Sequence, residues 1–376
     1  MSGGVHPPIE TVVAWSKIAN PSNPSQTRGW ELVVLVVILF SITIFTVVAR
    51  LWARLKVQHN AGLDDIIVVV TMIPTTGLAL AIALGPASRL YGHNRHVWDL
   101  SPSMTVNSRK ITMVISALYV ISTSLTKISI LLFYRRMSDR VSKAFRFAVH
   151  ACIVFVIAYM ITFLTTLFLT CRPINAYWNQ VYIPWALSHE EGVDYHCLNE
   201  PADLLAASAI SIVQDFLVCG MPTLLFWKLK LPRRQKIALA AVFGIGFFLC
   251  ITGILRVIYI TNIFFHTYDT TWATEPVWVW TAVEAHLAIV CASAPALKVF
   301  FKQYLNVSSI TGSWRDASRL RSFFRKGYEE KAGLATFGTS STAAGDIELG
   351  KIKVVCEVDI DTEHKRIDSH DGSVLR

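Results

Sequence analysis

The sequence predicts an all-α membrane protein, a bundle of seven transmembrane helices with its N-terminus outside and its C-terminus in the cytoplasm. The chain is 53% hydrophobic and only 16% charged, whereas an ordinary soluble domain carries charge on about a quarter of its residues. Its apolar residues also fall in long runs instead of the short periodic stripes that form a soluble core. A lipid bilayer as the surrounding solvent accounts for both observations.

Seven stretches are apolar enough for a helix to cross the hydrocarbon core, which takes about 20 residues. They are residues 31–49, 64–84, 111–133, 147–169, 204–226, 237–260 and 277–300, within a membrane domain at 30–305. No apolar stretch precedes Trp30, so we expect the first span itself to direct insertion. Residues 1–29 contain four prolines and are expected to form a disordered extracytoplasmic lead.

The distribution of Lys and Arg predicts the orientation, because short loops rich in these residues stay in the cytoplasm. The connections after the first, third and fifth spans carry most of them: Arg50, Arg54, Lys56, Arg135, Arg136, Arg140, Lys143, Arg146, Lys228, Lys230, Arg233, Arg234 and Lys236. The second connection is an exception, with Arg89, Arg95, Arg109 and Lys110, and is outweighed by the other three. The sequon at Asn306 then lies inside, where we expect no glycosylation.

The C-terminal tail changes character after the last span. Residues 306–332 mix aromatic side chains with Arg and Lys, which fits either an interfacial basic helix on an anionic leaflet or a solvated linker. Residues 333–376 are rich in Gly, Ser, Thr and charge, and are expected to be a disordered cytoplasmic tail.

Two of the seven cysteines are expected to form a disulfide. Only Cys171 and Cys197 fall in extracytoplasmic positions in this topology, and the exterior is oxidising. The bridge would tie the fourth connection to the top of the fourth span.

Ionisable side chains inside the spans are candidates for a functional site, because charge in a bilayer is costly. By depth, Lys127 would reach Asp64 or Asp65, and Arg256 would pair with Glu284, while Asp215 has no evident partner. Two interpretations remain open: buried pairs that fix the helix register, or a polar outer cavity. The candidates for that cavity and network are Lys127, Asp65, Asp215, Arg256, Glu284, His286 and Trp280, with Trp272 and Trp278 also near the mouth.

Other classes of function find little support in the residues. The basic residues form no continuous face with interleaved aromatics, so we expect no nucleic-acid partner. The histidines expected in the outer half have no carboxylate or thiol at a ligand spacing, so we expect no metal. No catalytic motif is present, and we do not expect an enzyme.

Short motifs in order along residues 30–305 resemble the fungal rhodopsin-domain family, which includes Pth-eleven-like receptor candidates and a satratoxin-cluster membrane protein. The motifs are Asp64-Asp65, Gly92 with His96-Val97-Trp98-Asp99-Leu100, Leu125 to Arg136, Cys171-Arg172-Pro173 with Trp178, Cys197, Asp215 with Pro222, Leu231 to Lys236, Arg256, Glu284 and Ala294 to Leu297. The resemblance implies a filamentous fungus and membrane proteins of mostly unassigned biochemistry, some from secondary-metabolite gene clusters.

The family name does not lead us to expect a retinal cofactor. Opsin-type pigments attach retinal to a Lys in the middle of the seventh helix, and residues 277–297 contain none. We therefore expect no cofactor.

The remaining interpretations differ in what the seven helices do. The first is a receptor-like sensor of a small molecule, associated with secondary-metabolite (mycotoxin) biosynthesis, and the second is a transporter or channel for a hydrophobic metabolite. An intramembrane enzyme that uses the outer histidines is the third and least favoured. The expected partners are the lipid bilayer, an unknown small molecule and a cytosolic signalling protein. The expected location is the plasma membrane or another membrane of the secretory pathway.

Overall fold

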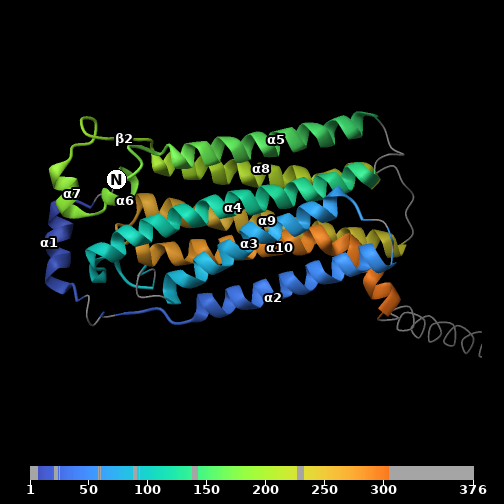
Figure 1. Ribbon diagram of the computed structural model, residues 1–376, viewed down its shortest axis with the longest axis horizontal. Coiled ribbons are helices and arrows are strands. Elements are labelled where there is room, and N and C mark those ends of the chain that lie inside the picture. The colour runs from blue at the N-terminus through green and yellow to red at the C-terminus, as the bar shows by residue number, and fades with distance from the viewer. Residues whose placement is uncertain are drawn as a thin grey trace, which may run out of the picture. The chain divides into compact units, whose positions relative to one another are not determined.

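Seven long helices make up most of the described part of the chain in a computed structural model (Figure 1). They are α2 (Glu31–Trp52), α3 (Leu63–Ala87), α4 (Pro102–Met137), α5 (Lys143–Phe168), α8 (Glu200–Phe226), α9 (Arg233–Phe265) and α10 (Thr270–Tyr304). The structure describes residues 7–20, 24, 26–57, 59, 61–87, 91–92, 94–137, 143–226 and 233–304. The segments expected at 306–332 and 333–376, with Asn306, lie outside these residues.

Each of these helices contains a stretch long and apolar enough to cross a membrane, which confirms the predicted seven-helix class. Several helices are longer than the apolar runs that predicted them. The third begins at Pro102 instead of residue 111, and proline is favoured at the first position of a helix, where its missing N–H costs nothing. Helices continue past the hydrocarbon core wherever their polar ends remain solvated, so apolar runs underestimate their length.

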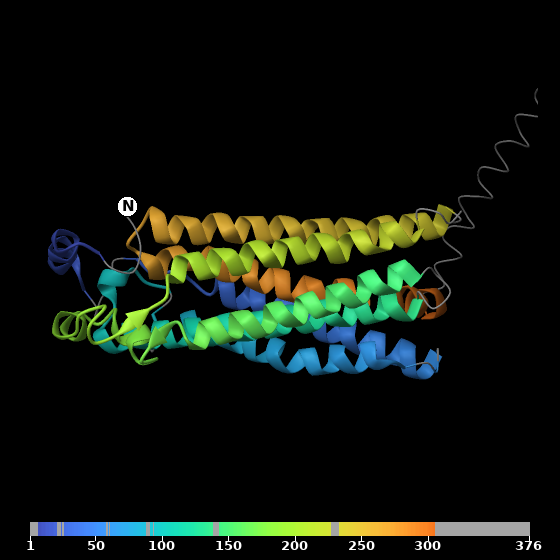
Figure 2. The same cartoon turned by 90° about the horizontal axis from the view of Figure 1, so that it is seen from above.

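The seven helices close into a ring in the order α2, α3, α4, α5, α8, α9, α10 and back to α2, and α4 also contacts α10 across it (Figures 1 and 2). Small side chains permit the close approach of α10. Ala282 and Ala285 are fully buried, and small residues let membrane helices pack without a hydrophobic driving force between them. The result is a bundle in which α4 and α10 are the most buried helices.

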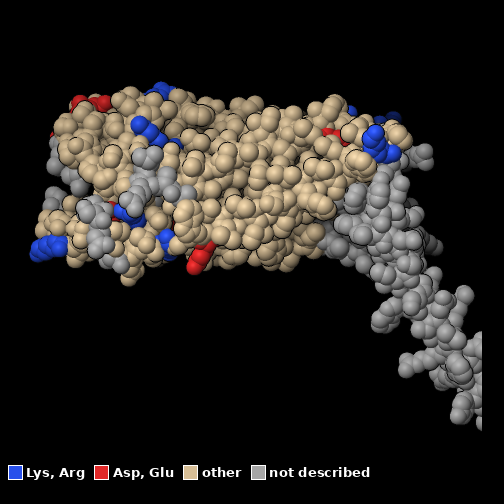
Figure 3. Space-filling view, turned by 60° about the horizontal axis from the view of Figure 1, so that its bottom comes forward, with Lys and Arg blue, Asp and Glu red and all other residues tan. Residues whose placement is uncertain are grey.

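Large apolar side chains point outward along the middle of the bundle. Phe45, Val154, Ile161 and Ile258 are more than half exposed, which a soluble protein rarely allows over a wide belt. Figure 3 shows Lys, Arg, Asp and Glu gathered towards the two ends, with a tan belt of other residues between them. This belt is the surface that lipid would cover.

One end of the bundle, called here the disulfide end, carries most of the short elements. They are α1 (Ile9–Ile18), η2 (Val97–Asp99), β1 (Cys171–Arg172), α6 (Ala176–Asn179), α7 (Ile183–Ser188) and β2 (His196–Cys197). The opposite end carries η1 (Ala53–Val57).

Helix α1 lies within the lead for which we expected no regular structure. Trp15 on this helix packs against Trp98 with ring centroids 5.7 Å apart, and the Asn20 N–H donates to Asp99 Oδ1 at 3.0 Å. These contacts with the loop between α3 and α4 supply an apolar surface that the sequence of the lead does not reveal.

Candidate functional site

A cavity of about 140 Å³ lies between α4, α8, α9 and α10 in the half of the bundle towards the disulfide end. Its walls combine apolar side chains with hydroxyl groups. Ile260, Ile263 and Phe264 on α9 and Val277 and Trp278 on α10 supply apolar surface, and Ser and Thr residues from α4, α8 and α10 supply the hydroxyls. An apolar cavity with a few polar groups is typical of small-molecule sites.

Arg256 is the cationic group in the depth of this cavity. Its Nε lies 3.3 Å from Glu284 Oε2, and its guanidinium carbon lies 4.3 Å from the ring centre of Tyr119. The Tyr119 hydroxyl donates to the other oxygen of Glu284 at 2.5 Å. The expected pairing of Arg256 with Glu284 is therefore present, and it links α9, α10 and α4.

The ion pair leaves hydrogen-bonding capacity unused. Among the described residues, neither Nε nor Nη2 of Arg256 has an acceptor in hydrogen-bond geometry, and Glu284 Oε2 has no donor. Arg256 is only 6% exposed and Glu284 only 2%. A buried polar group without a partner costs about 1–3 kcal/mol, and a charged one more. Water, an ion or a ligand in the cavity would supply the missing partners.

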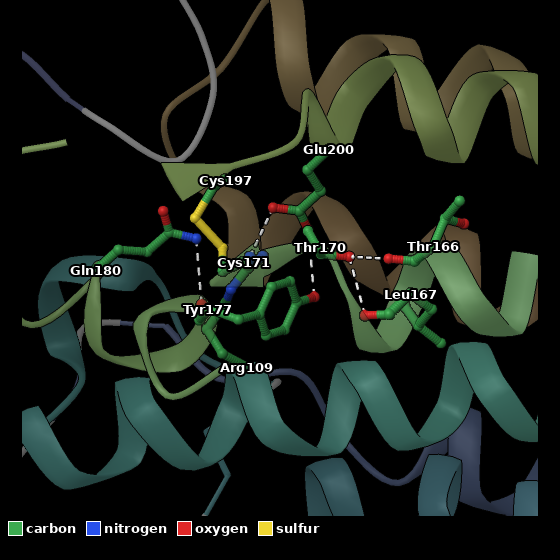
Figure 4. Close-up of a disulfide and its surroundings, with 9 residues drawn as sticks. All are labelled: Arg109, Thr166, Leu167, Thr170, Cys171, Tyr177, Gln180, Cys197 and Glu200. Atoms are coloured by element: carbon green, nitrogen blue, oxygen red, sulfur yellow. Dashed lines mark hydrogen bonds and ion pairs between the residues drawn. A yellow bond between two sulfur atoms is a disulfide. The ribbon is translucent and has the colours of Figure 1, made fainter. Parts of the chain in front are cut away.

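A second Arg lines the cavity nearer the disulfide end. The Arg109 Nη2 donates to Glu200 Oε2 at 2.6 Å, and its guanidinium carbon lies 4.3 Å from the ring centre of Tyr177. Tyr177 in turn donates its hydroxyl to Glu200 Oε1 at 3.3 Å (Figure 4). Burial raises the pKa of the Tyr177 phenol above its ordinary value, which keeps it protonated as a donor.

This pair accounts for part of the exception in the charge distribution. Arg109 and Lys110 lie inside α4, not in the second connection, and Arg109 is neutralised by Glu200. Sequence reasoning missed this group because the apolar run begins after both residues. The sequence feature that could have indicated this pair is Glu200, a carboxylate four residues before the apolar run of the fifth span.

Side chains from three separate segments form a cluster, called here the cap, next to the cavity residues Val97 and Thr271. The His96 ring stacks between Trp98 and Trp272, with centroids 4.4 and 4.1 Å away, and its Nδ1 lies 2.5 Å from Asp269 Oδ2. The Arg28 guanidinium also lies over the Trp272 ring, with its central carbon 4.1 Å from the ring centre. Arg28 also pairs with Glu275.

The cap is attached directly to the cavity wall. The N–H of Val97 donates to Asp269 Oδ1 at 2.9 Å, and Thr271 donates its hydroxyl to the Arg95 carbonyl at the same distance. Both Val97 and Thr271 line the cavity. The cap and the cavity wall are therefore connected through Val97 and Thr271.

The prediction that Lys127 reaches Asp64 or Asp65 was wrong. Its Nζ lies 3.1 Å from Asp215 Oδ1 and donates to the carbonyl and hydroxyl of Ser211 at 3.0 and 2.9 Å. Asp215, which we expected to lack a partner, is therefore paired, because Lys127 points from α4 towards α8 and not towards α3. Neither residue lines the cavity.

Asp64 and Asp65 bind Arg50 instead. The Arg50 Nη2 and Nε donate to Asp64 Oδ2 at 2.8 Å and Asp65 Oδ1 at 2.9 Å, and Nη1 donates to the carbonyl of Ala292. The sequence placed Arg50 in a loop, but α2 continues to Trp52 and buries its side chain. Asp65 thus belongs to a cluster at the opposite end and is remote from the cavity.

Two further residues expected at an outer cavity lie elsewhere. The His286 ring is buried, and its Nδ1 lies 3.0 Å from the Thr43 hydroxyl on α2, so it faces away from α9. Trp278, and not Trp280, contributes to the cavity wall. Within the described residues, no three His, Cys, Asp or Glu side chains gather as a metal site would require.

The predicted disulfide between Cys171 and Cys197 is present (Figure 4). The two residues are directly opposite in the antiparallel pair of β1 and β2, with Cα atoms 4.0 Å apart. This pair connects the end of α5 to the start of α8. It also holds α6, and with it Tyr177, beside Arg109.

Comparison with known proteins agrees with the architecture. The model of the fungal rhodopsin domain matches residues 49–303. A SAT4 family membrane protein of Emericella nidulans is 27% identical over 57% of this chain and 51% of its own length. The receptor GIN3 of Arthrobotrys oligospora is 26% identical over 74% of this chain and 64% of its own length. The chain thus spans about half to two thirds of these two curated relatives.

A further relative comes from a biosynthetic gene cluster. The wortmanamides biosynthesis cluster protein C of Talaromyces wortmannii is 24% identical over 74% of this chain and 72% of its own length. No solved structure matches the chain.

Seven apolar helices that enclose buried ion pairs and a cavity define the class as polytopic membrane proteins of receptor-like architecture. Within that class, the chain belongs to the fungal rhodopsin-domain family, which includes members from secondary-metabolite clusters.

Proposed function

We propose that this protein is a receptor-like sensor that binds a small molecule in the cavity between α4, α8, α9 and α10. The single observation that carries the proposal is a mainly apolar cavity whose deepest charged group, Arg256, is buried with unused hydrogen-bond donors. A ligand with an acceptor would supply the missing partner. We expect binding without turnover.

In the proposed orientation, the cavity lies in the half of the bundle that faces away from the cytosol. A disulfide at the same end favours an oxidising compartment there. The Arg-rich opposite end would then meet a cytosolic partner, and the membrane would be the plasma membrane or another one of the secretory pathway. The cluster-derived relative favours a ligand connected with secondary metabolism.

We propose that retinal is not the ligand. A retinal Schiff base needs a Lys amine, and residues 270–297 of the last helix contain no Lys. Lys127 is bound to Asp215 and does not line the cavity.

A transporter for a hydrophobic metabolite is the second candidate. One observation favours it: the Lys127–Asp215 pair adds further buried charge to that of Arg256 and Glu284, and buried charges can mark a substrate or proton path. Flux of a bound compound across vesicles that contain the purified protein would favour transport over sensing.

Blocking the cavity tests the proposed site. Ala207 lines the cavity, so Ala207→Trp would fill it, whereas Ala206→Trp adds the same side chain at an exposed position of α8. We expect compounds from a library of small amphipathic molecules to raise the melting temperature of the natural protein and of Ala206→Trp. The same compounds should leave Ala207→Trp unchanged. Equal shifts in all three proteins would place the ligand elsewhere.

A further inference from the structure

The two arginines that line the cavity differ in how their guanidinium groups are used. Arg109 donates from Nη2 to Glu200 at 2.6 Å, and of its buried nitrogens only Nε lacks an acceptor among the described residues. Arg256 faces Glu284 at 3.3 Å without hydrogen-bond geometry, and its Nη2 has no acceptor among the described residues. At 6% exposed, Arg256 is also out of reach of bulk water.

We propose that Arg256 is the anchor for the carboxylate of a compact, mainly apolar acid. The inference rests on the proposed function, in that the cavity must bind a small molecule, and it adds the chemical class of that molecule. A guanidinium presents a planar fork of N–H donors that matches the two oxygens of a carboxylate. A neutral carbonyl would use the same donors less strongly, because the hydrogen bond would carry charge on one side only.

The cavity limits the size and shape of such an acid. An engineered apolar cavity of about 150 Å³ holds one benzene molecule, and the volume here is about 140 Å³. Ile260, Ile263 and Phe264 form an apolar wall on α9 towards the disulfide end from Arg256. A single ring or a short alkyl chain would lie against this wall with its carboxylate at the guanidinium.

Glu284 would compete with the ligand carboxylate for the Arg256 guanidinium. It holds one edge of Arg256 while the Tyr119 hydroxyl fixes its other oxygen at 2.5 Å. A ligand carboxylate would bring a second negative charge to a single guanidinium in a medium of low dielectric, where like charges repel strongly. Removal of the Glu284 charge should therefore strengthen acid binding, and removal of the Arg256 charge should weaken it.

The test uses benzoate and benzamide, which share size and shape and differ in charge. Binding is measured at pH 7 by equilibrium dialysis of the full chain in lipid nanodiscs, with empty nanodiscs as the background. We expect the natural protein to bind benzoate about tenfold more tightly than benzamide, the effect of about 1.4 kcal/mol. Arg256→Gln should remove that preference, and Arg256→Lys should reduce it.

The Glu284→Gln variant is the most informative comparison, because misfolding cannot produce a gain in affinity. We expect it to bind benzoate about tenfold more tightly than the natural protein, with benzamide changed less than about twofold. Asp203→Asn is the matched control, since it removes a carboxylate on α8 that does not line the cavity, and it should change neither affinity.

Failure of this inference and failure of the proposed function have different results. Equal binding of benzoate and benzamide, or weaker benzoate binding by Glu284→Gln, would overturn the carboxylate anchor and leave the cavity as a ligand site. The anchor would also fail if neither probe bound while library compounds still distinguished Ala206→Trp from Ala207→Trp. If no compound bound the natural protein, both proposals would fail.

Discussion

Two clusters that join Arg to carboxylates lie in different halves of the bundle and differ in how fully they are satisfied. At the opposite end from the disulfide, Arg50 donates to Asp64, Asp65 and the carbonyl of Ala292 from three different nitrogens. In the half towards the disulfide, Arg256 is paired with Glu284, and its Nε and Nη2 lack acceptors among the described residues. Both arginines are buried.

The difference separates a structural role from a binding role. A buried guanidinium whose three nitrogens all donate fixes the packing of the helices around it, here α2, α3 and α10. We interpret a buried charge with spare donors beside a cavity, as at Arg256, as a site for a partner from outside the chain, in line with the proposed function. Degree of satisfaction, more than burial or residue type, therefore identifies the candidate ligand site.

The largest effect is expected at the satisfied cluster. Arg50→Met would leave two buried carboxylates without their main partner and should cost about 3–5 kcal/mol of folding free energy. Arg54→Met is the control, because Arg54 lies farther from the same carboxylates, at 3.7 and 3.9 Å. Melting temperature and yield of folded protein measure the effect. Equal losses in both variants would contradict the structural role assigned to Arg50.

The Lys127–Asp215 pair should show a loss that a second substitution repairs. Lys127→Met leaves Asp215 buried and unpaired, which costs about 3–5 kcal/mol, whereas replacement of both partners by apolar residues is often nearly neutral. We expect Lys127→Met/Asp215→Leu to melt close to the natural protein. A double variant as unstable as the single one would mean that the charges are needed for more than each other.

The disulfide should contribute less than either buried pair. Cys171 and Cys197 are separated by 26 residues, and closing a loop of this size typically stabilises a fold by about 2–4 kcal/mol. The single variants Cys171→Ser and Cys197→Ser should each lower the melting temperature as much as the double variant does. Because the loop holds Tyr177 beside Arg109, all three should also weaken ligand binding.

The smallest effect is expected at the cap. His96→Ala removes two stacking contacts and the partner of Asp269, and an aromatic pair contributes about 0.5–1.5 kcal/mol beyond its buried area. We expect a small loss of stability but faster release of bound ligand, measured as a dissociation rate. His96→Phe retains the stack and should release ligand at an intermediate rate. Unchanged rates in both variants would separate the cap from the cavity.

The sequence predicts the fold better than the site. An apolar run shows how deep a residue lies in the membrane, but it does not show which neighbouring helix the side chain faces. Hydrophobic runs located all seven helices, and topology alone paired Cys171 with Cys197. Depth also paired Arg256 correctly with Glu284. The partner of Lys127 was wrong because Asp64 and Asp215 both lie within plausible reach along the membrane normal, and only the rotation of α4 decides between them.

Helix ends were the second source of error. Apolar windows stop where charge begins, so Arg50 and Arg109 were assigned to loops although α2 and α4 contain them. Both residues pair with carboxylates on other helices, which lowers the cost of their burial, and one sequence does not reveal these pairs. The cap of His96 and Trp272 joins segments far apart in the chain and gives no local signal either.

A structure of the full chain in lipid with a bound compound would show whether the cavity at Arg256 binds the ligand. The compound should be one that stabilises Ala206→Trp but not Ala207→Trp. We expect ligand density in the cavity, with an oxygen within about 3 Å of the Arg256 guanidinium. Density at another position, with Arg256 still lacking an acceptor, would contradict it.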